Sequence, residues 1–245
     1  MSGGWTGPPP AAVVVDLDDT VYPQAAYLYG AARAVGRAGA AAGLDQVQLS
    51  RALRSELVAG SDTGGTIDRA LFACGVPSAL AAAVLPDLVA AFTGYRPRRL
   101  PLYVGAAAAL AALRGRFPLA CLTDGNPVIQ RAKLAATGVA AVFRTVVITD
   151  EWGGRAARKP HPDGLRRVAA ALGVAPADMV VVGDRPGKDM AIAAALGARS
   201  IRVCTGEYAD SPDTPPATAV VADLPAAASL LLNTPPKAGG RVGPT

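Results

Sequence analysis

Residues that build disulfide frameworks and zinc sites are scarce in this chain. Its 245 residues include three cysteines and one histidine. The cysteines, Cys74, Cys121 and Cys204, are far apart in the sequence and odd in number, which argues against a disulfide framework or a zinc site. We therefore expect each cysteine to be a small buried hydrophobic residue in a reducing compartment.

Long hydrophobic runs and clusters of aromatic residues are also absent. No stretch of 18 consecutive apolar residues occurs, so we expect no transmembrane helix and no membrane partner. The amino terminus lacks a basic segment followed by a long apolar one, so we expect no secretory signal and a cytoplasmic location. The net charge of +5 comes from scattered basic residues, whereas nucleic-acid binding favours a concentrated patch with aromatics. We expect no nucleic-acid partner, and this mild charge suits a small anionic substrate.

Short apolar runs, each closed by polar or turn residues, recur along the chain. Runs of this kind, often β-branched, are typical of buried strands. They predict strands at 11–17, 118–122, 146–148, 179–182, 200–204 and 219–222. Alanine-rich segments predict helices between the later strands, at 105–114, 127–137, 162–172 and 188–196. Because strands and helices alternate, we predict an α/β fold with a Rossmann-like parallel sheet.

The gap between the first and second predicted strands is unusually long. Residues 22–96 contain four Ala-, Leu- and Arg-rich stretches separated by turn signals, which fits the loop lengths of a helical bundle. We predict that 22–96 form a small helical cap domain inserted into a core made of 11–21 and 97–232. The Gly- and Pro-rich segments 1–10 and 233–245 are expected to be a disordered leader and tail.

Acidic residues follow two of the predicted strands. Asp16 and Asp18 come directly after the first strand, two residues apart and therefore on one side of an extended chain. Asp184 follows the fourth strand. Ligands of open α/β sheets bind beyond the carboxyl ends of the strands where strand order reverses, so these residues converge if those two strands are neighbours. Clustered carboxylates favour a bound cation, and oxygen ligands that leave room for phosphate suit Mg²⁺.

Two further segments carry residues suited to phosphate. Thr123 and Asp124 follow the second predicted strand and precede Gly125 and a helix. A hydroxyl and the amides of a helix N-terminus can hold an anion there. Lys159 lies just before the helix predicted from 162. Each signal is weak alone, because a threonine at a strand end is usually a helix cap and a lone lysine is usually solvated.

Together these segments resemble the haloacid dehalogenase (HAD) superfamily of phosphotransferases. The first motif of that family is matched by Asp16-Leu17-Asp18-Asp19-Thr20, and the second by Thr123 after an apolar strand. The third is matched by Lys159-Pro160, and the fourth, GDxxxxD, by residues 183–189. Order and spacing agree across residues 11–232. The insert after the first motif resembles the helical C1 cap of the family.

The resemblance implies a role for each matching acidic residue. Asp16 would be the nucleophile that forms an aspartyl-phosphate. Asp18 would be the general acid for the leaving group and then the base for water. Mg²⁺ would be held by Asp16, Asp184 and the backbone carbonyl of Asp18.

The resemblance also implies the phosphate site and its support. Thr123 and the amide of Asp124 would hold the transferring phosphoryl group, together with Lys159, which would also be part of the catalytic set. Asp189 would lie behind the metal ligands, where it would orient them and pair with Lys159.

These residues favour a Mg²⁺-dependent phosphatase acting on a small phosphomonoester, either a sugar phosphate or a nucleoside monophosphate. A closing cap would admit a small metabolite and exclude bulk water. The alternatives are a phosphomutase of the same superfamily, which returns the phosphoryl group to another hydroxyl, and a non-catalytic phosphate-binding module. The segment 60–66 is the best candidate for a cap loop facing the site, because its glycines permit unusual backbone angles, although it would equally serve as a plain turn.

Overall fold

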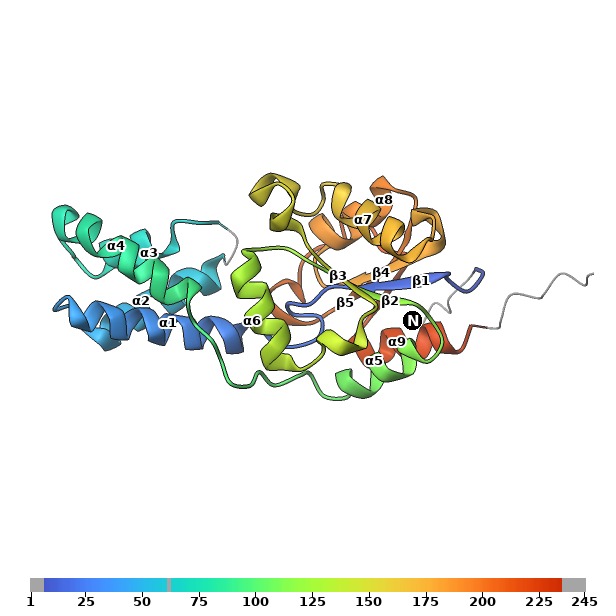
Figure 1. Ribbon diagram of the computed structural model, residues 1–245, viewed down its shortest axis with the longest axis horizontal. Coiled ribbons are helices and arrows are strands. Elements are labelled where there is room, and N and C mark those ends of the chain that lie inside the picture. The colour runs from blue at the N-terminus through green and yellow to red at the C-terminus, as the bar shows by residue number, and fades with distance from the viewer. Residues whose placement is uncertain (1–6, 61–62, 235–245) are drawn as a thin grey trace, which may run out of the picture.

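A parallel sheet forms the centre of the computed structural model, which describes residues 7–60 and 63–234 (Figure 1). The strands pair in the order β3-β2-β1-β4-β5-β6, so the predicted α/β fold is confirmed. Each strand lies within two residues of its expected bounds, a normal uncertainty for element ends. The strands are β1 (Ala12–Val15), β2 (Leu119–Thr123), β3 (Thr145–Ile148), β4 (Met179–Gly183), β5 (Arg199–Val203) and β6 (Ala219–Val221).

Helices cover both faces of the sheet. In Figure 1, α5 (Ala106–Arg114) and α9 (Leu224–Leu232) lie on one face, while α7 (Asp163–Leu172) and α8 (Ala191–Ala195) lie on the other. Val13 and Val15 belong to the core on the α5 side, and Val14 belongs to the core on the α7 side. A central parallel strand is covered on both faces, which explains its continuous apolar sequence.

Four helices between β1 and α5 pack on one another to the left of the sheet in Figure 1. Their shared core includes Leu49, Leu53, Leu71 and Leu88, all almost completely buried. Their bounds agree within one residue with the four Ala-, Leu- and Arg-rich stretches of the sequence, at 25–42, 46–59, 66–74 and 78–92. The four helices are α1 (Gln24–Ala41), α2 (Gln46–Ala59), α3 (Thr66–Ala73) and α4 (Ser78–Thr93).

Packed residues extend into both segments that were expected to be disordered. Pro10 is buried next to β1. Thr234 follows α9 and is buried, and its backbone carbonyl accepts a hydrogen bond from Arg116. The rest of that expectation, for residues 1–6 and 235–245, lies outside the described residues. Glycine and proline content alone does not mark where packing ends, because tertiary contacts can order such residues.

Two helical segments near the carboxyl end of the chain differ from the sequence prediction. The helix expected over 188–196 is a turn of π-helix over Pro186–Met190 followed by the short α8. Helix α9 was not anticipated; it begins at the N-cap Asp223, whose carboxylate accepts from the amide of Ala226 (2.9 Å).

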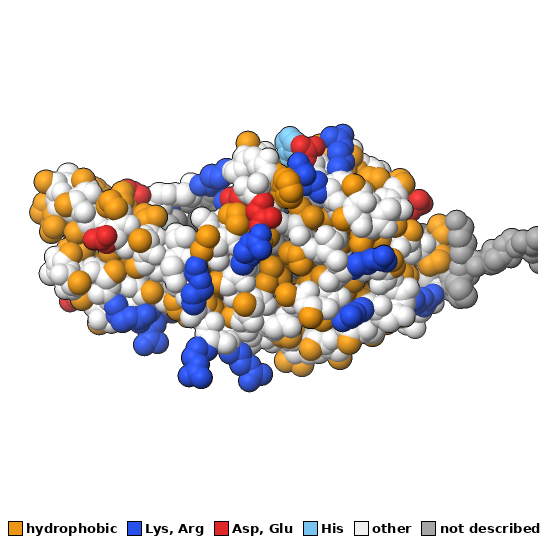
Figure 2. Space-filling view, viewed as in Figure 1, with side chains coloured by type: hydrophobic (Ala, Val, Ile, Leu, Met, Phe, Trp, Pro, Cys, Tyr) orange, Lys and Arg blue, Asp and Glu red, His pale blue; other side chains and the backbone are white. Residues whose placement is uncertain are grey.

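Basic side chains are interspersed among apolar ones on the surface (Figure 2). On the face shown in Figure 2, lysines and arginines are spread over several positions.

Phe72 of α3 is the most exposed of the large aromatic side chains described, at 86%. Among the described residues, no helix combines the length and apolar character needed to cross a membrane.

A loop after β5 closes against the turn after β1. Asp19 has a left-handed φ of 53°, which aspartate adopts more readily than most residues. Its carboxylate accepts from the backbone amides of Gln24 (2.9 Å) and Glu207 (3.2 Å). A Cβ added at Gly206 would lie 2.0 Å from the Cγ of Asp19. This contact ties the start of α1 to the β5 loop and requires glycine at 206.

We expect Gly206→Ala to destabilise the fold more than Gly138→Ala. Both glycines are left-handed, with φ of 69° and 71°, so both variants carry a backbone cost of about 1–2 kcal/mol. A Cβ at Gly138 would meet no atom within 4 Å, whereas the overlap at Gly206 should add about 1–3 kcal/mol. Urea unfolding measures the two losses, and equal losses would contradict the tight contact with Asp19.

Candidate active site

Side chains that follow three neighbouring strands meet at the carboxyl edge of the sheet. Strand β1 pairs with β2 on one side and β4 on the other, so the strand order reverses beside β1. Asp16 follows β1, Thr123 ends β2, and Asp184 follows β4. This is the position where open α/β sheets bind their ligands.

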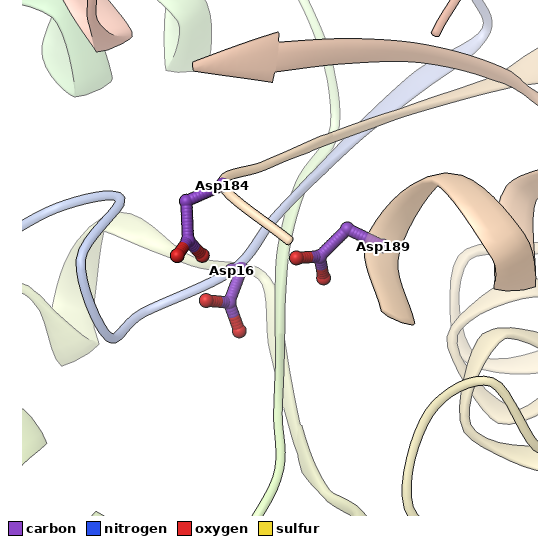
Figure 3. A group of neighbouring side chains, drawn as sticks. All are labelled: Asp16, Asp184 and Asp189. Atoms are coloured by element: carbon purple, nitrogen blue, oxygen red, sulfur yellow. The ribbon is translucent and has the colours of Figure 1, made fainter. Parts of the chain in front are cut away.

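Three carboxylates gather at this edge (Figure 3). Oxygens of Asp16, Asp184 and Asp189 all lie within 4.8 Å of one another, and each residue is buried. A Cβ at Gly183 would lie 2.3 Å from the Cγ of Asp189, so glycine in the fourth motif lets Asp189 approach β4. The Oδ1 atom of Asp184 is buried without a hydrogen-bond partner. A buried, unpartnered carboxylate oxygen beside two others is a donor set that fits a hard divalent cation.

The protein environment opposes ionisation of this cluster in the absence of a cation. Burial raises the pKa of Asp16 to about 7, against the influence of Lys159 and with help from the charges of Asp189 and Asp18. Burial and the charges of Asp16 and Asp189 also raise the pKa of Asp184 well above its usual range. A cation among the oxygens would favour the ionised forms.

Lys159 places a positive charge against this cluster. Its Nζ donates to Oδ1 of Asp16 (2.6 Å) and to Oδ1 of Asp189 (2.7 Å), and the residue is only 4% exposed. Burial lowers the pKa of the ammonium, but the charges of Asp16, Asp189 and Asp124 outweigh burial and hold the pKa well above its usual range. The contact with Asp189 is the pairing that the resemblance implied. Lys159 is therefore a fixed positive charge beside Asp16.

Thr123 and Asp124 lie between this cluster and the start of α6 (Pro127–Thr137). Thr123 is buried, and its hydroxyl accepts from the side-chain amide of Gln130. Asp124 accepts from the hydroxyl of Thr149 (2.9 Å) and pairs with Lys188 (3.1 Å). The Asp124 side chain thus ties neighbouring loops together. The phosphate-binding role of Thr123 and of the Asp124 amide stays a prediction.

Asp18 faces away from the acidic cluster, toward α6. Lys133 Nζ lies 2.8 Å from each carboxylate oxygen, and Gln130 donates to Oδ2 (3.0 Å). Tyr22, which follows the first motif, is fully buried and donates its hydroxyl to Oδ1. Burial acts to raise the pKa of Asp18, but Lys133 and the hydrogen bonds from Lys133, Tyr22 and Gln130 lower it below its usual value. A metal contact through the backbone carbonyl of Asp18 stays a prediction.

Sequence reasoning missed Gln130 and Lys133. The signal that could have found them is their spacing of three residues on the helix after the second motif, which places both on one face. That face is buried here, with Gln130 at 1% and Lys133 at 4% exposure.

A cavity of about 230 Å³ lies above the acidic cluster and Lys159. It is located between the sheet and the four-helix unit, formed by α1 to α4. The four-helix side contributes Leu28, Leu57 and Phe92 to its wall, as well as Gly64 and Thr66 from the expected cap loop. Residues 61–62 of that loop lie outside the described part of the chain. A Cβ at Gly64 would lie 2.8 Å from Nη1 of Arg155, so this loop contacts the core across the cavity.

The match to a known family covers the residues just described. The family model for haloacid dehalogenase-like hydrolases matches residues 10–197. This range includes the acidic cluster, Lys159, Thr123 and the four-helix unit. The chain belongs to the haloacid dehalogenase-like hydrolase family, as its motifs led us to expect.

Two individual relatives with high sequence identity to the chain are phosphatases. The chain is 41% identical over 131 residues to the phosphoserine phosphatase of Thermus thermophilus, a match covering 53% of this chain and 51% of that one. It is 34% identical over 208 residues to the glyceraldehyde 3-phosphate phosphatase of Methanopyrus kandleri, covering 81% and 86%. The chain thus spans about half of the first relative and most of the second.

A solved structure supports the fold. The magnesium-bound HAD-hydrolase YfnB from Bacillus subtilis superposes with a TM-score of 0.66, over 91% of this chain and 99% of that one. Sequence identity is 17%, so this likeness concerns the fold alone.

We expect Asp184→Asn to weaken Mg²⁺ binding by at least about tenfold, because loss of a carboxylate charge removes part of the donor set. Isothermal titration of Mg²⁺ measures the change, and Asp163→Asn, a half-exposed carboxylate on α7, is the matched control. Without Mg²⁺ the variant should unfold at the wild-type temperature or above it, because it relieves repulsion. An unchanged Mg²⁺ titration would show that Asp184 has only a structural role.

Proposed function

We propose that this chain is a Mg²⁺-dependent phosphatase that hydrolyses a small phosphomonoester through an aspartyl-phosphate on Asp16. The observation that carries the proposal is the 2.6 Å contact between the buried Lys159 ammonium and Asp16, beside a carboxylate cluster suited to a divalent cation. Family membership and the two phosphatase relatives support the same reaction class.

In this proposal Asp16 and Asp184 hold Mg²⁺ together with the backbone carbonyl of Asp18. Bound Mg²⁺ would reduce the repulsion between the phosphoryl oxygens and an incoming carboxylate. Asp189 holds Lys159 in place through their 2.7 Å contact. Lys159 in turn orients Asp16 by donating a hydrogen bond to its Oδ1. The other carboxylate oxygen, Oδ2, is then available to attack phosphorus.

The first half-reaction transfers the phosphoryl group to Asp16. A carboxylate oxygen of Asp16 forms a bond to phosphorus while the bond from phosphorus to the leaving oxygen breaks. That oxygen keeps the bonding electron pair and takes a proton from Asp18. Because Lys133 and the hydrogen bonds lower the pKa of Asp18 in the substrate-free site, Asp18 must take up this proton when the substrate binds, before the step begins. The Thr123 hydroxyl, the Asp124 amide and Lys159 hold the phosphoryl oxygens as charge redistributes.

The second half-reaction releases phosphate. Asp18, now a carboxylate, takes a proton from water as the water oxygen attacks phosphorus. The bond between phosphorus and Asp16 breaks, which restores the Asp16 carboxylate and frees inorganic phosphate. The ion pair between Lys133 and the carboxylate of Asp18 supports the base form needed for this step.

The cavity supports a small substrate. We propose that the four-helix unit of residues 22–96 acts as the cap over the site, with Leu28, Leu57 and Phe92 facing the leaving group. A space of about 230 Å³ suits a metabolite rather than a polymer. Candidate substrates are sugar phosphates and nucleoside monophosphates, to which the two relatives add phosphoserine and glyceraldehyde 3-phosphate.

We expect Asp16→Asn to reduce phosphate release by a factor on the order of 10³ or more, because the amide cannot act as the nucleophile. Release of inorganic phosphate from a panel of these substrates, with and without EDTA, measures the activity. Asp163→Asn again serves as the surface control.

Three results would contradict the assignment. Near-wild-type release by Asp16→Asn would remove Asp16 as the nucleophile. Formation of an isomeric phosphate ester without phosphate release would indicate a phosphomutase. Tight binding of substrates with no turnover by the wild type would indicate a phosphate-binding module.

We expect Asp18→Asn to slow turnover of alkyl phosphates by about 10²–10⁴-fold, the usual contribution of general acid–base catalysis. With 4-nitrophenyl phosphate, whose leaving group needs little protonation, formation of the phosphoenzyme should be much less affected. Single-turnover quench experiments separate the two half-reactions. An equal loss in the first half-reaction for both leaving groups would exclude Asp18 as the acid.

A further inference from the structure

The carboxylate of Asp18 makes a full set of contacts with this chain alone. Oδ1 accepts from the Tyr22 hydroxyl and from Lys133, while Oδ2 accepts from Gln130 and from Lys133. A carboxylate has about four acceptor positions. A leaving group or a water molecule can therefore reach Asp18 only if one of these donors gives up its contact.

The three donors are not equivalent. Tyr22 and Gln130 each contact one oxygen, whereas Lys133 lies 2.8 Å from both. A small rotation of the Asp18 carboxylate therefore breaks the contact with Tyr22 or Gln130 but leaves one contact with Lys133. Lys133 is the donor that can follow Asp18 through the reaction.

Gln130 and Lys133 also connect Asp18 to other parts of the site. The Gln130 side-chain amide contacts both Asp18 and the hydroxyl of Thr123, the group proposed to hold the phosphoryl oxygens. The Lys133 ammonium lies 5.0 Å from the ring centre of Tyr27 on α1, a distance at which the two attract. Burying a lysine and a glutamine together on one helix face is unusual unless their partners are fixed.

We propose that Lys133 and Gln130 are positioning residues for Asp18. Gln130 sets the distance between the acid and the phosphate-holding hydroxyl. Lys133 keeps one Asp18 oxygen paired while the other turns toward the leaving group and later toward water. This inference rests on the proposed function, because it takes Asp18 as the general acid and base.

Lys133→Met tests the proposal, because methionine has a similar volume and no charge. We expect kcat for an alkyl phosphate to fall about 10- to 100-fold, since small misplacements of a catalytic group have effects of this size. The loss should be smaller with 4-nitrophenyl phosphate, and KM should change less than about twofold. Arg131→Met is the matched control: this residue is also on α6, its side chain is 69% exposed, and it pairs with Glu151.

Two kinetic outcomes would overturn the proposal. An equal loss of kcat with both leaving groups would give Lys133 a general structural role. A raised KM with unchanged kcat would make Lys133 a substrate-binding residue. If Lys133→Met does not fold, Gln130→Glu provides the kinetic test. Glutamate has the same size as glutamine but places an acceptor, not a donor, against Asp18. The loss of kcat should show the same dependence on the leaving group.

A measurement without substrate separates this inference from the proposed function. Urea unfolding of Asp18→Asn, Lys133→Met and the double variant forms a double-mutant cycle. If the two side chains are paired, the double variant should lose less stability than the sum of the single losses. Additive losses would overturn the pairing, whether or not the wild type releases phosphate. If the wild type shows no Mg²⁺-dependent phosphate release but the double-mutant cycle still shows coupling, the proposed function is wrong and the pairing of Asp18 with Lys133 stands.

Discussion

A lysine ammonium buried between two carboxylates sets the arrangement of the whole site. Lys159 contacts Asp16 and Asp189 at 2.6 and 2.7 Å, and Asp184 completes an acidic cluster around them. With all three carboxylates ionised, the four charges sum to −2, which a divalent cation would balance. A buried charge needs such compensation, so the lysine, the aspartates and the cation they suit form one interdependent unit.

The same constraint explains why two aspartates two residues apart have opposite environments. Asp16 lies among other carboxylates, and burial raises its pKa to about 7. Asp18 points to the other side, where Lys133 and its hydrogen bonds outweigh burial and lower its pKa. Separate surroundings allow two chemically identical groups to take different roles, which in our proposal are those of nucleophile and proton carrier. Lys133 and Gln130 of α6, together with Tyr22, lower the pKa of Asp18, whereas burial raises the pKa of Asp16.

Much of this arrangement could be predicted because it depends on strand ends. Apolar runs place Asp16 and Asp184 after parallel strands, whose carboxyl ends necessarily share one edge of the sheet. The contacts of Lys133 could not be predicted, since an isolated lysine on a helix looks like a solvated surface group until its neighbours are known. Helix α9 and the burial of Thr234 likewise depend on packing between distant segments and leave little local signal.

The central claim is that Asp16 carries the phosphoryl group during turnover. An aspartyl-phosphate is an acyl phosphate, which borohydride reduces to an alcohol, so a trapped intermediate converts that aspartate to homoserine. Wild-type enzyme quenched in borohydride during turnover with Mg²⁺ should yield a peptide with homoserine at position 16, identified by mass spectrometry. The same modification at another aspartate, or none while phosphate is being released, would contradict the account.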